Sequence, residues 1–244
     1  MRITKSTAVT AILPAFVLMP AFTASSVAAQ EGTPTMSYSC EMVAASPMAG
    51  MEGMTMSTPM AEEGHDMDGQ SVEVDQLYID MMLPHHESII ALAQAAQDRL
   101  TDERLQTIAD NIITAQSAEN EELRGLREQW YGSAESMPMD ESMMGMMTEM
   151  MPGMGDMAAM QMQMDPQALV AAFCAGEDPD QTFIDMVIPH HEMAIQTSEA
   201  ALEQATHEEL RAIAEQVIQA QQAEIDELEG IRAELTGEGT PAAS

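Results

Sequence analysis

Apolar positions recur with helical spacing in two separate stretches of the chain. In the first stretch they alternate at intervals of four and three residues, which places them on one face of an amphipathic helix. The members of this face are Ile79, Leu83, His86, Ile90 and Ala93, and the second stretch repeats the spacing with Ile184, Ile188, His191, Ile195 and Ser198. Each stretch therefore predicts one long helix.

A second helix is expected after each of these. The first begins near Thr101, where Asp102 and Glu103 suit a helix first turn. Its counterpart begins with Thr206-His207-Glu208-Glu209, which fits a capping box. One heptad column follows in each helix, formed by Leu105, Ile112 and Leu126 in the first and by Leu210, Val217 and Ile231 in the second. Each pair of helices is predicted to form a hairpin.

The two hairpins are copies of one sequence pattern. The segment Asp80–Glu87 recurs as Asp185–Glu192, 105 residues further on, and the match continues without a gap to Arg127 and Arg232. One hairpin cannot bury its apolar face alone, so two hairpins are expected to pack together. The sequence predicts an all-α protein in which two tandem hairpins form a four-helix bundle.

The N-terminus has the features of a secretion signal. Arg2 and Lys5 precede the apolar run Ala8–Phe22, and Val27-Ala28-Ala29 offers small residues for cleavage. The run is too short for a membrane span, so we expect an exported protein, periplasmic, extracellular or at the cell surface. The predicted organisation is a signal peptide (1–29), a Met-rich segment (30–75), the first hairpin (76–132), a Met-rich linker (133–180), the second hairpin (181–236) and a tail (237–244).

Charge and cysteine content narrow the functional classes. With 41 acidic and 8 basic residues the formal net charge is −33, which disfavours binding to nucleic acid or to an anionic membrane surface. Cys40 and Cys174 favour a disulfide outside the cytoplasm, because metal-binding thiolates would normally show closely spaced cysteine pairs.

Methionine is the outstanding residue type, with 27 in the chain. Two segments, Met42–Met67 and Met137–Met164, combine methionine with glycine and proline, and we expect both to be flexible rather than packed helices. A thioether is neutral and polarizable and prefers Cu(I), so these segments are candidate copper ligands. The densest run supplies Met143, Met144, Met146 and Met147.

Polar residues occupy predicted core positions in both hairpins. His86 and His191 lie on the apolar faces, and Glu119 and Glu224 lie in the heptad columns. Two interpretations are open: buried His–Glu hydrogen bonds that fix helix register, or metal ligation inside the bundle, which we favour because both copies keep the set. The adjacent His85 and His190 are expected to complete the site or to face a partner chain, and the carboxylates Asp80, Glu87 and Asp185 are either ligands or solvated charges.

The repeated motif resembles the exported proteins of domain-of-unknown-function family 305. Asp185-Met186-Val187-Ile188-Pro189-His190-His191-Glu192, followed by Gln221-Gln222-Ala223-Glu224, carries the resemblance, and the first copy is similar. The resemblance implies a ferritin-like bundle and, by analogy with Met-rich family members, copper binding by the matching histidines and by Met81 and Met186.

We therefore expect an exported protein that binds copper, as Cu(I) or Cu(II), and buffers, stores or carries it without being an enzyme. Iron is a less favoured metal. Two alternatives remain open, a ferritin-like di-iron oxidase and a scavenger that consumes oxidants as methionine sulfoxide. Metal ions are the expected partners, with another copper-handling protein or a second copy of the chain as further candidates.

Overall fold

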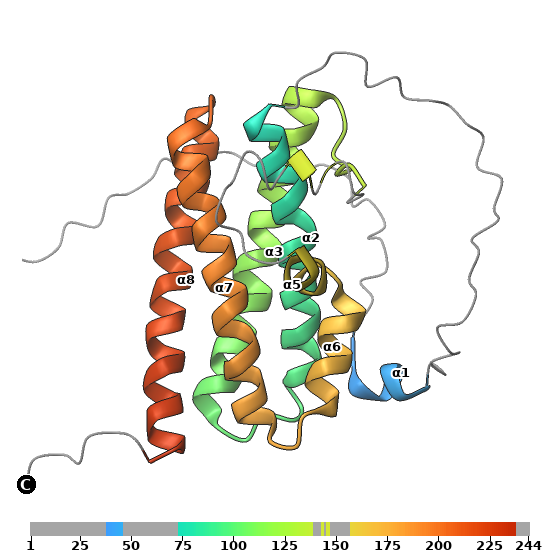
Figure 1. Ribbon diagram of the computed structural model, residues 1–244, viewed down its shortest axis with the longest axis vertical. Coiled ribbons are helices and arrows are strands. Elements are labelled where there is room, and N and C mark those ends of the chain that lie inside the picture. Colours follow the sequence, from blue (N-terminus) through green and yellow to red (C-terminus); the bar gives the residue numbers. More distant parts are fainter. Residues whose placement is uncertain (1–37, 46–72, 139–142, 144, 147–156, 238–244) are drawn as a thin grey trace, which may run out of the picture. The chain divides into compact units, whose positions relative to one another are not determined.

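The computed structural model describes residues 38–45, 73–138, 143, 145–146 and 157–237, and all regular elements among these residues are helices. The four long ones are α2 (Val74–Ala96), α3 (Glu103–Tyr131), α7 (Pro179–Gln204) and α8 (Glu208–Leu235). They run alongside one another in Figure 1, with α2 packed on α3, α7 packed on α8, and the two hairpins joined mainly through α2 and α7. The predicted all-α bundle is confirmed.

Each hairpin turn is closed by an aspartate from the other hairpin. Asp75, in the first turn of α2, accepts hydrogen bonds of 2.8 Å from the backbone N–H groups of Thr206 and His207, just before α8. Asp180, in the first turn of α7, accepts from the N–H of Thr101 at 2.8 Å, just before α3. The capping box expected at Thr206 is therefore wrong: the N-cap residue is His207, its side chain makes no capping bond, and the reciprocal aspartates satisfy these backbone donors instead.

Shorter helices accompany the bundle, and those whose bounds the structure describes are α1 (Cys40–Ala45), α5 (Met157–Gln163) and α6 (Pro166–Ala175). The expectation that Met137–Met164 holds no packed helix is wrong for α5, because its residues 157–163 contain neither glycine nor proline. Met143 and Met160 are 3% and 1% exposed and pack in the core, as adaptable apolar side chains do.

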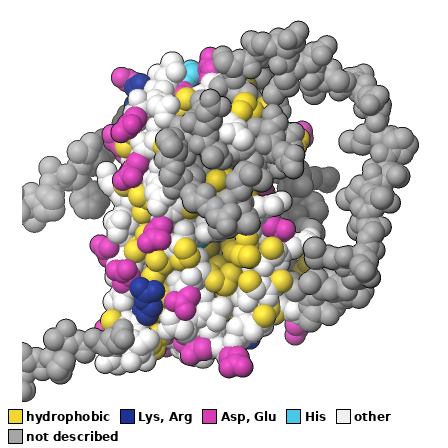
Figure 2. All heavy atoms as spheres, viewed as in Figure 1, with side chains coloured by type: hydrophobic (Ala, Val, Ile, Leu, Met, Phe, Trp, Pro, Cys, Tyr) yellow, Lys and Arg dark blue, Asp and Glu magenta, His cyan; other side chains and the backbone are white. Residues whose placement is uncertain are grey.

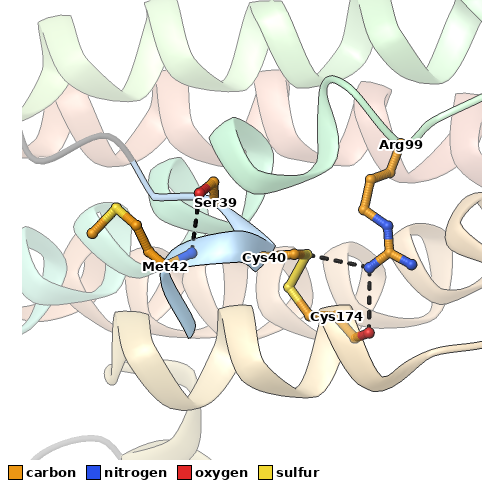
Figure 3. Close-up of a disulfide and its surroundings, with 5 residues drawn as sticks. All are labelled: Ser39, Cys40, Met42, Arg99 and Cys174. Carbon is orange, nitrogen blue, oxygen red and sulfur yellow. Dashed lines mark hydrogen bonds between the residues drawn. A yellow bond between two sulfur atoms is a disulfide. The ribbon is translucent and has the colours of Figure 1, made fainter. Parts of the chain in front are cut away.

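The predicted disulfide is present and fastens α1 to α6. Cys40 and Cys174 are bonded, with 5.5 Å between their Cα atoms (Figure 3). The guanidinium of Arg99, just after α2, donates to Cys40 Sγ at 3.2 Å and to the backbone carbonyl of Cys174 at 3.3 Å. The disulfide therefore ties the segment preceding the first hairpin to the segment preceding the second.

The described surface is acidic. On the face shown in Figure 2, Asp and Glu side chains are spread widely and Lys or Arg side chains are sparse. Among the helices of the described residues, none is long and apolar enough to cross a membrane. The predicted signal peptide, residues 46–72 of the first Met-rich segment and residues 238–244 lie outside the described residues.

Candidate metal centre

Four histidines lie halfway along the bundle, between two apolar clusters. One cluster joins the second half of α2 to the first half of α7, and the other joins the first half of α2 to the second half of α7. His85 and His86 on α2 and His190 and His191 on α7 fall between them, and all four are 0% exposed. We call these four residues the histidine layer.

The layer brings together residues that are far apart in the sequence. The rings of His85 and His190 stack, with 3.6 Å between centroids and 28° between planes. Within each helix the neighbouring rings are farther apart, with 6.3 Å between centroids for His85 and His86 and again for His190 and His191. The closest approach is thus across the α2–α7 contact, between matching positions of the two hairpins.

Burial keeps the imidazoles of His85, His86 and His190 uncharged. The pKa values of His85 and His190 lie well below the ordinary value, chiefly because burial disfavours the charged form and secondly because neighbouring histidines would repel it. Burial likewise lowers the pKa of His86 to about 3, although the side chain of Asn120 partly offsets the effect. Neutral imidazole is the form that binds metals.

Several polar atoms in this region have no hydrogen-bond partner among the described residues. They include both ring nitrogens of His85 and His86, Nδ1 of His190 and of His191, and side-chain atoms of Gln116, Glu119, Asn120, Gln163 and Gln221. Buried polar groups in proteins are nearly always paired, so unpaired ones point to a group that binds there.

Two glutamates border the layer. Glu224 Oε2 lies 2.7 Å from Nε2 of His191, whereas Glu119 Oε2 lies 3.7 Å from Nε2 of His86, too far for a hydrogen bond. Burial, followed by the charges of Glu224 and Glu122, raises the pKa of Glu119 to about 7. The side chains of Glu119 and Glu224 are 20% and 21% exposed, whereas the four histidines are fully buried.

The aspartates of the repeated motif do not join the layer. Asp80 is 0% exposed and forms a two-pronged ion pair with Arg127. Asp185 is exposed, accepts from Gln181 and lies 3.7 Å from Arg232. Asp80 is therefore neither a free ligand nor a solvated charge but part of the core, while Glu87, also exposed, pairs with Arg124.

The candidate methionines fall in different environments. Met81 is buried and its sulfur accepts from the Thr197 hydroxyl at 3.8 Å, while Met186 is partly buried against the other apolar cluster. Met143 is in the core cluster that also contains Met81, Met160 and Met193, and Met146 packs against it. Met144 and Met147 lie outside the described residues.

Sequence reasoning missed some residues around the layer. Ser88 lies beside His190, and Gln163 at the end of α5 meets Ser88. Gln116 and Gln221 each precede a site glutamate by three residues, which is a detectable signal, but the contact of α5 with α2 has no sequence pattern of its own.

Within the described part of the chain, no three His, Cys, Asp or Glu side chains already converge as a metal site.

Comparison with known proteins places the chain in a family. The profile described as "Domain of unknown function (DUF305)" matches residues 75–232, which includes both hairpins. No curated protein matches the chain.

Solved structures share the fold. CopM in its Cu(I)-bound form is 24% identical, with a TM-score of 0.51 over 68% of this chain and 99% of that one. A DUF305 protein of Streptomyces coelicolor, described as secreted, is 21% identical, with a TM-score of 0.52 over 66% and 93%. A DUF305 fragment from Deinococcus radiodurans is 21% identical, with a TM-score of 0.50 over 67% and 97%.

Proposed function

This chain belongs to the DUF305 family, and from its histidine layer we propose that it binds copper outside the cytoplasm and buffers, stores or carries it. The observation that carries the proposal is a group of four fully buried imidazoles with six ring nitrogens unpaired among the described residues. Leaving a buried polar group unpaired costs about 1–3 kcal/mol. A bound cation would satisfy the ring nitrogens that lack a hydrogen.

The surrounding groups favour a soft ion. The ligand candidates are buried imidazoles and, in the adjoining apolar cluster, the thioethers of Met81 and Met193. Thioethers select Cu(I), whereas iron sites in helical bundles rely on several carboxylates. Among the described residues, the carboxylates that border the layer are those of Glu119 and Glu224, so copper fits this donor set better than iron. CopM, which shares the fold, has been seen with Cu(I) bound, but the proposal rests on the residues of this chain.

We assign the Met-rich segments a separate role. Their thioethers would capture Cu(I), and the histidine layer would hold a further copper ion. Met143 is buried with the core, so within the densest run the capture role falls on Met144, Met146 and Met147. We propose no catalytic step for the chain.

The proposal also covers organisation and location. We infer that the two hairpins are tandem copies of one unit in a ferritin-like arrangement, on the strength of the repeated motif and the reciprocal caps of Asp75 and Asp180. The N-terminal signal features support our proposal that the protein acts outside the cytoplasm, in the periplasm or beyond. A copper-handling protein that delivers or accepts the ion is the expected partner.

An anaerobic Cu(I) titration against a chromophoric chelator tests the proposal. We expect the intact protein to withdraw copper from the chelator and the double variant His85→Leu/His190→Leu to withdraw less. His207→Gln is the matched control, because His207 lies at the start of α8 and bonds Asp75 instead of joining the layer. Equal copper uptake by wild type and the double variant would refute a role for the layer, and iron retained in preference to copper would favour an oxidase.

A variant of the Met run tests the division of labour. Replacing Met144, Met146 and Met147 by Leu keeps the side chains apolar and removes the sulfurs. We expect this variant to lose weaker Cu(I) equivalents and to keep the copper bound by the histidine layer. Loss of the same equivalents in both variants would show that the two sets of residues form one site.

A further inference from the structure

The two halves of the histidine layer differ in their hydrogen bonding. On α7, Nε2 of His190 lies 3.0 Å from Ser88 Oγ, and Nε2 of His191 lies 2.7 Å from Glu224 Oε2. On α2, neither ring nitrogen of His85 or of His86 has a partner among the described residues. The α7 rings are therefore held through one nitrogen each, while the α2 rings are not.

The surroundings of Ser88 determine which atom donates in its hydrogen bond with His190. Its hydroxyl carries one hydrogen, and it contacts two backbone carbonyls, that of His85 at 2.7 Å and that of Gln163 at the end of α5. A carbonyl only accepts, so the hydroxyl hydrogen is committed to a carbonyl. The oxygen of Ser88 must then accept from His190, which requires a hydrogen on Nε2.

His191 also carries its ring hydrogen on Nε2, but because of a different partner. A carboxylate accepts only, so the contact with Glu224 requires a hydrogen on Nε2 of His191. A neutral imidazole carries one hydrogen, so Nδ1 of both α7 histidines then has a free lone pair. Both Nδ1 atoms are buried and have no partner among the described residues.

We propose that Ser88 and Glu224 are positioning residues that hold His190 and His191 as Nε2–H tautomers, so that both rings offer Nδ1 to the metal. This inference rests on the proposed copper binding and deepens it. Metal-binding histidines commonly donate their second nitrogen to an oxygen that fixes the ring. Glu224 thus orients a ligand and is not itself a ligand.

The second hairpin supplies pre-oriented ligands, and the first supplies adaptable ones. At the positions that match Ser88 and Glu224, the chain has Met193 and Glu119, and Glu119 is 3.7 Å from its histidine. Ser88 also joins His190 to the carbonyl of Gln163 in α5. The Met-rich linker is therefore in direct hydrogen-bond contact with the group that orients a ligand.

Nitrogen-15 NMR of the histidine rings tests the proposal in the full-length protein. At pH 8, where an ordinary imidazole is neutral, we expect both α7 histidines of the metal-free protein to be Nε2–H tautomers. Added Ag(I), a diamagnetic probe for Cu(I), should then shift the Nδ1 signals of His190 and His191 and leave their Nε2 atoms protonated. A mixture of tautomers, or Nδ1–H, in the metal-free protein would overturn the proposal.

Variants separate positioning from folding. Ser88→Ala should convert His190 to mixed tautomers and weaken Ag(I) binding about tenfold, within the range for groups that orient ligands. Ser88→Thr keeps the hydroxyl, so it should keep both the single tautomer and the Ag(I) affinity. Ser198→Ala is the matched control, since Ser198 is a buried serine of α7 whose hydroxyl bonds Tyr78. If Ser88→Ala and Ser198→Ala alter the His190 ring equally, Ser88 has only a structural role.

The two proposals can fail separately. Fixed tautomers without any Ag(I)-induced shift of the four rings would refute copper binding by the layer and the Nδ1 assignment with it. Metal-induced shifts at Nε2 of His190, with loss of its hydrogen, would leave copper binding intact and refute the positioning role of Ser88.

Discussion

Matching positions of the two hairpins each hold an Asp–Arg ion pair, and the two pairs lie in very different environments. The side chains of Asp80 and Arg127 are 0% and 5% exposed, whereas those of Asp185 and Arg232 are 54% and 38% exposed. Arg127 bonds both carboxylate oxygens of Asp80 and also donates to the backbone carbonyl of Ser133 at 2.7 Å. The repeat therefore provides a buried pair and its own exposed control.

We expect Arg127→Met to destabilise the protein much more than Arg232→Met. Removing the buried guanidinium leaves the Asp80 carboxylate unpaired in the core, which costs about 3–5 kcal/mol. Losing the exposed pair costs about 0–1 kcal/mol. At roughly 2–4 °C per kcal/mol for a domain of this size, the melting temperature falls by roughly 6–20 °C in the first variant and by at most about 4 °C in the second.

Urea unfolding followed by far-UV circular dichroism measures both losses. The double variant Asp80→Leu/Arg127→Met removes both buried charges, so it should recover most of the stability that Arg127→Met loses. Equal losses in Arg127→Met and Arg232→Met would refute the argument from burial. A double variant as unstable as Arg127→Met would show that packing of the long side chain matters more than its charge.

Three further predictions concern pH and the disulfide. Because the pKa of His86 falls from 6.5 to about 3 on folding, the free energy of unfolding should decrease below pH 6.5 by up to about 1.4 kcal/mol per pH unit. Urea titrations at several pH values should show that His86→Leu lacks this contribution to the pH dependence. The pKa of Glu119 instead rises from 4.5 to about 7 on folding, so the folded state loses stability as pH rises through this window. Glu119→Gln should therefore be about 3 kcal/mol more stable than wild type at pH 8, with no gain at pH 4. An equal gain at both pH values would contradict this. Cys40→Ala/Cys174→Ala should lower the free energy of unfolding by about 2–5 kcal/mol, and an unchanged denaturation midpoint would show that the disulfide does not constrain the bundle.

The helical framework could be predicted because its signal is local. Intervals of three and four residues place Leu83 and His86 on one helix face, and the same spacing recurs around His191. The complete burial of His85 and His190 could not be predicted from this spacing, since both residues lie beside the predicted apolar face. They are buried because α2 and α7 are the helices through which the two hairpins meet.

Contacts over long sequence distances account for what the sequence did not reveal. Asp80 and Asp185 have the same motif, but only Asp80 is in the core, where it meets Arg127, 47 residues away. In the sequence, nothing distinguishes Ser88 from other polar helix residues, and its role depends on the packing of α5, which places the Gln163 carbonyl beside it. Tertiary packing, and not the repeated pattern, makes the two halves of the layer different.

The exchange of Asp75 and Asp180 between the hairpin turns has a consequence for assembly. Each hairpin carries an aspartate that accepts hydrogen bonds from backbone N–H groups in the other hairpin's turn. A chain with a single hairpin would obtain this acceptor only by pairing with a second copy across a two-fold axis. Hairpins expressed as separate chains should therefore be incomplete alone and should associate when mixed, each supplying the carboxylate that the other needs.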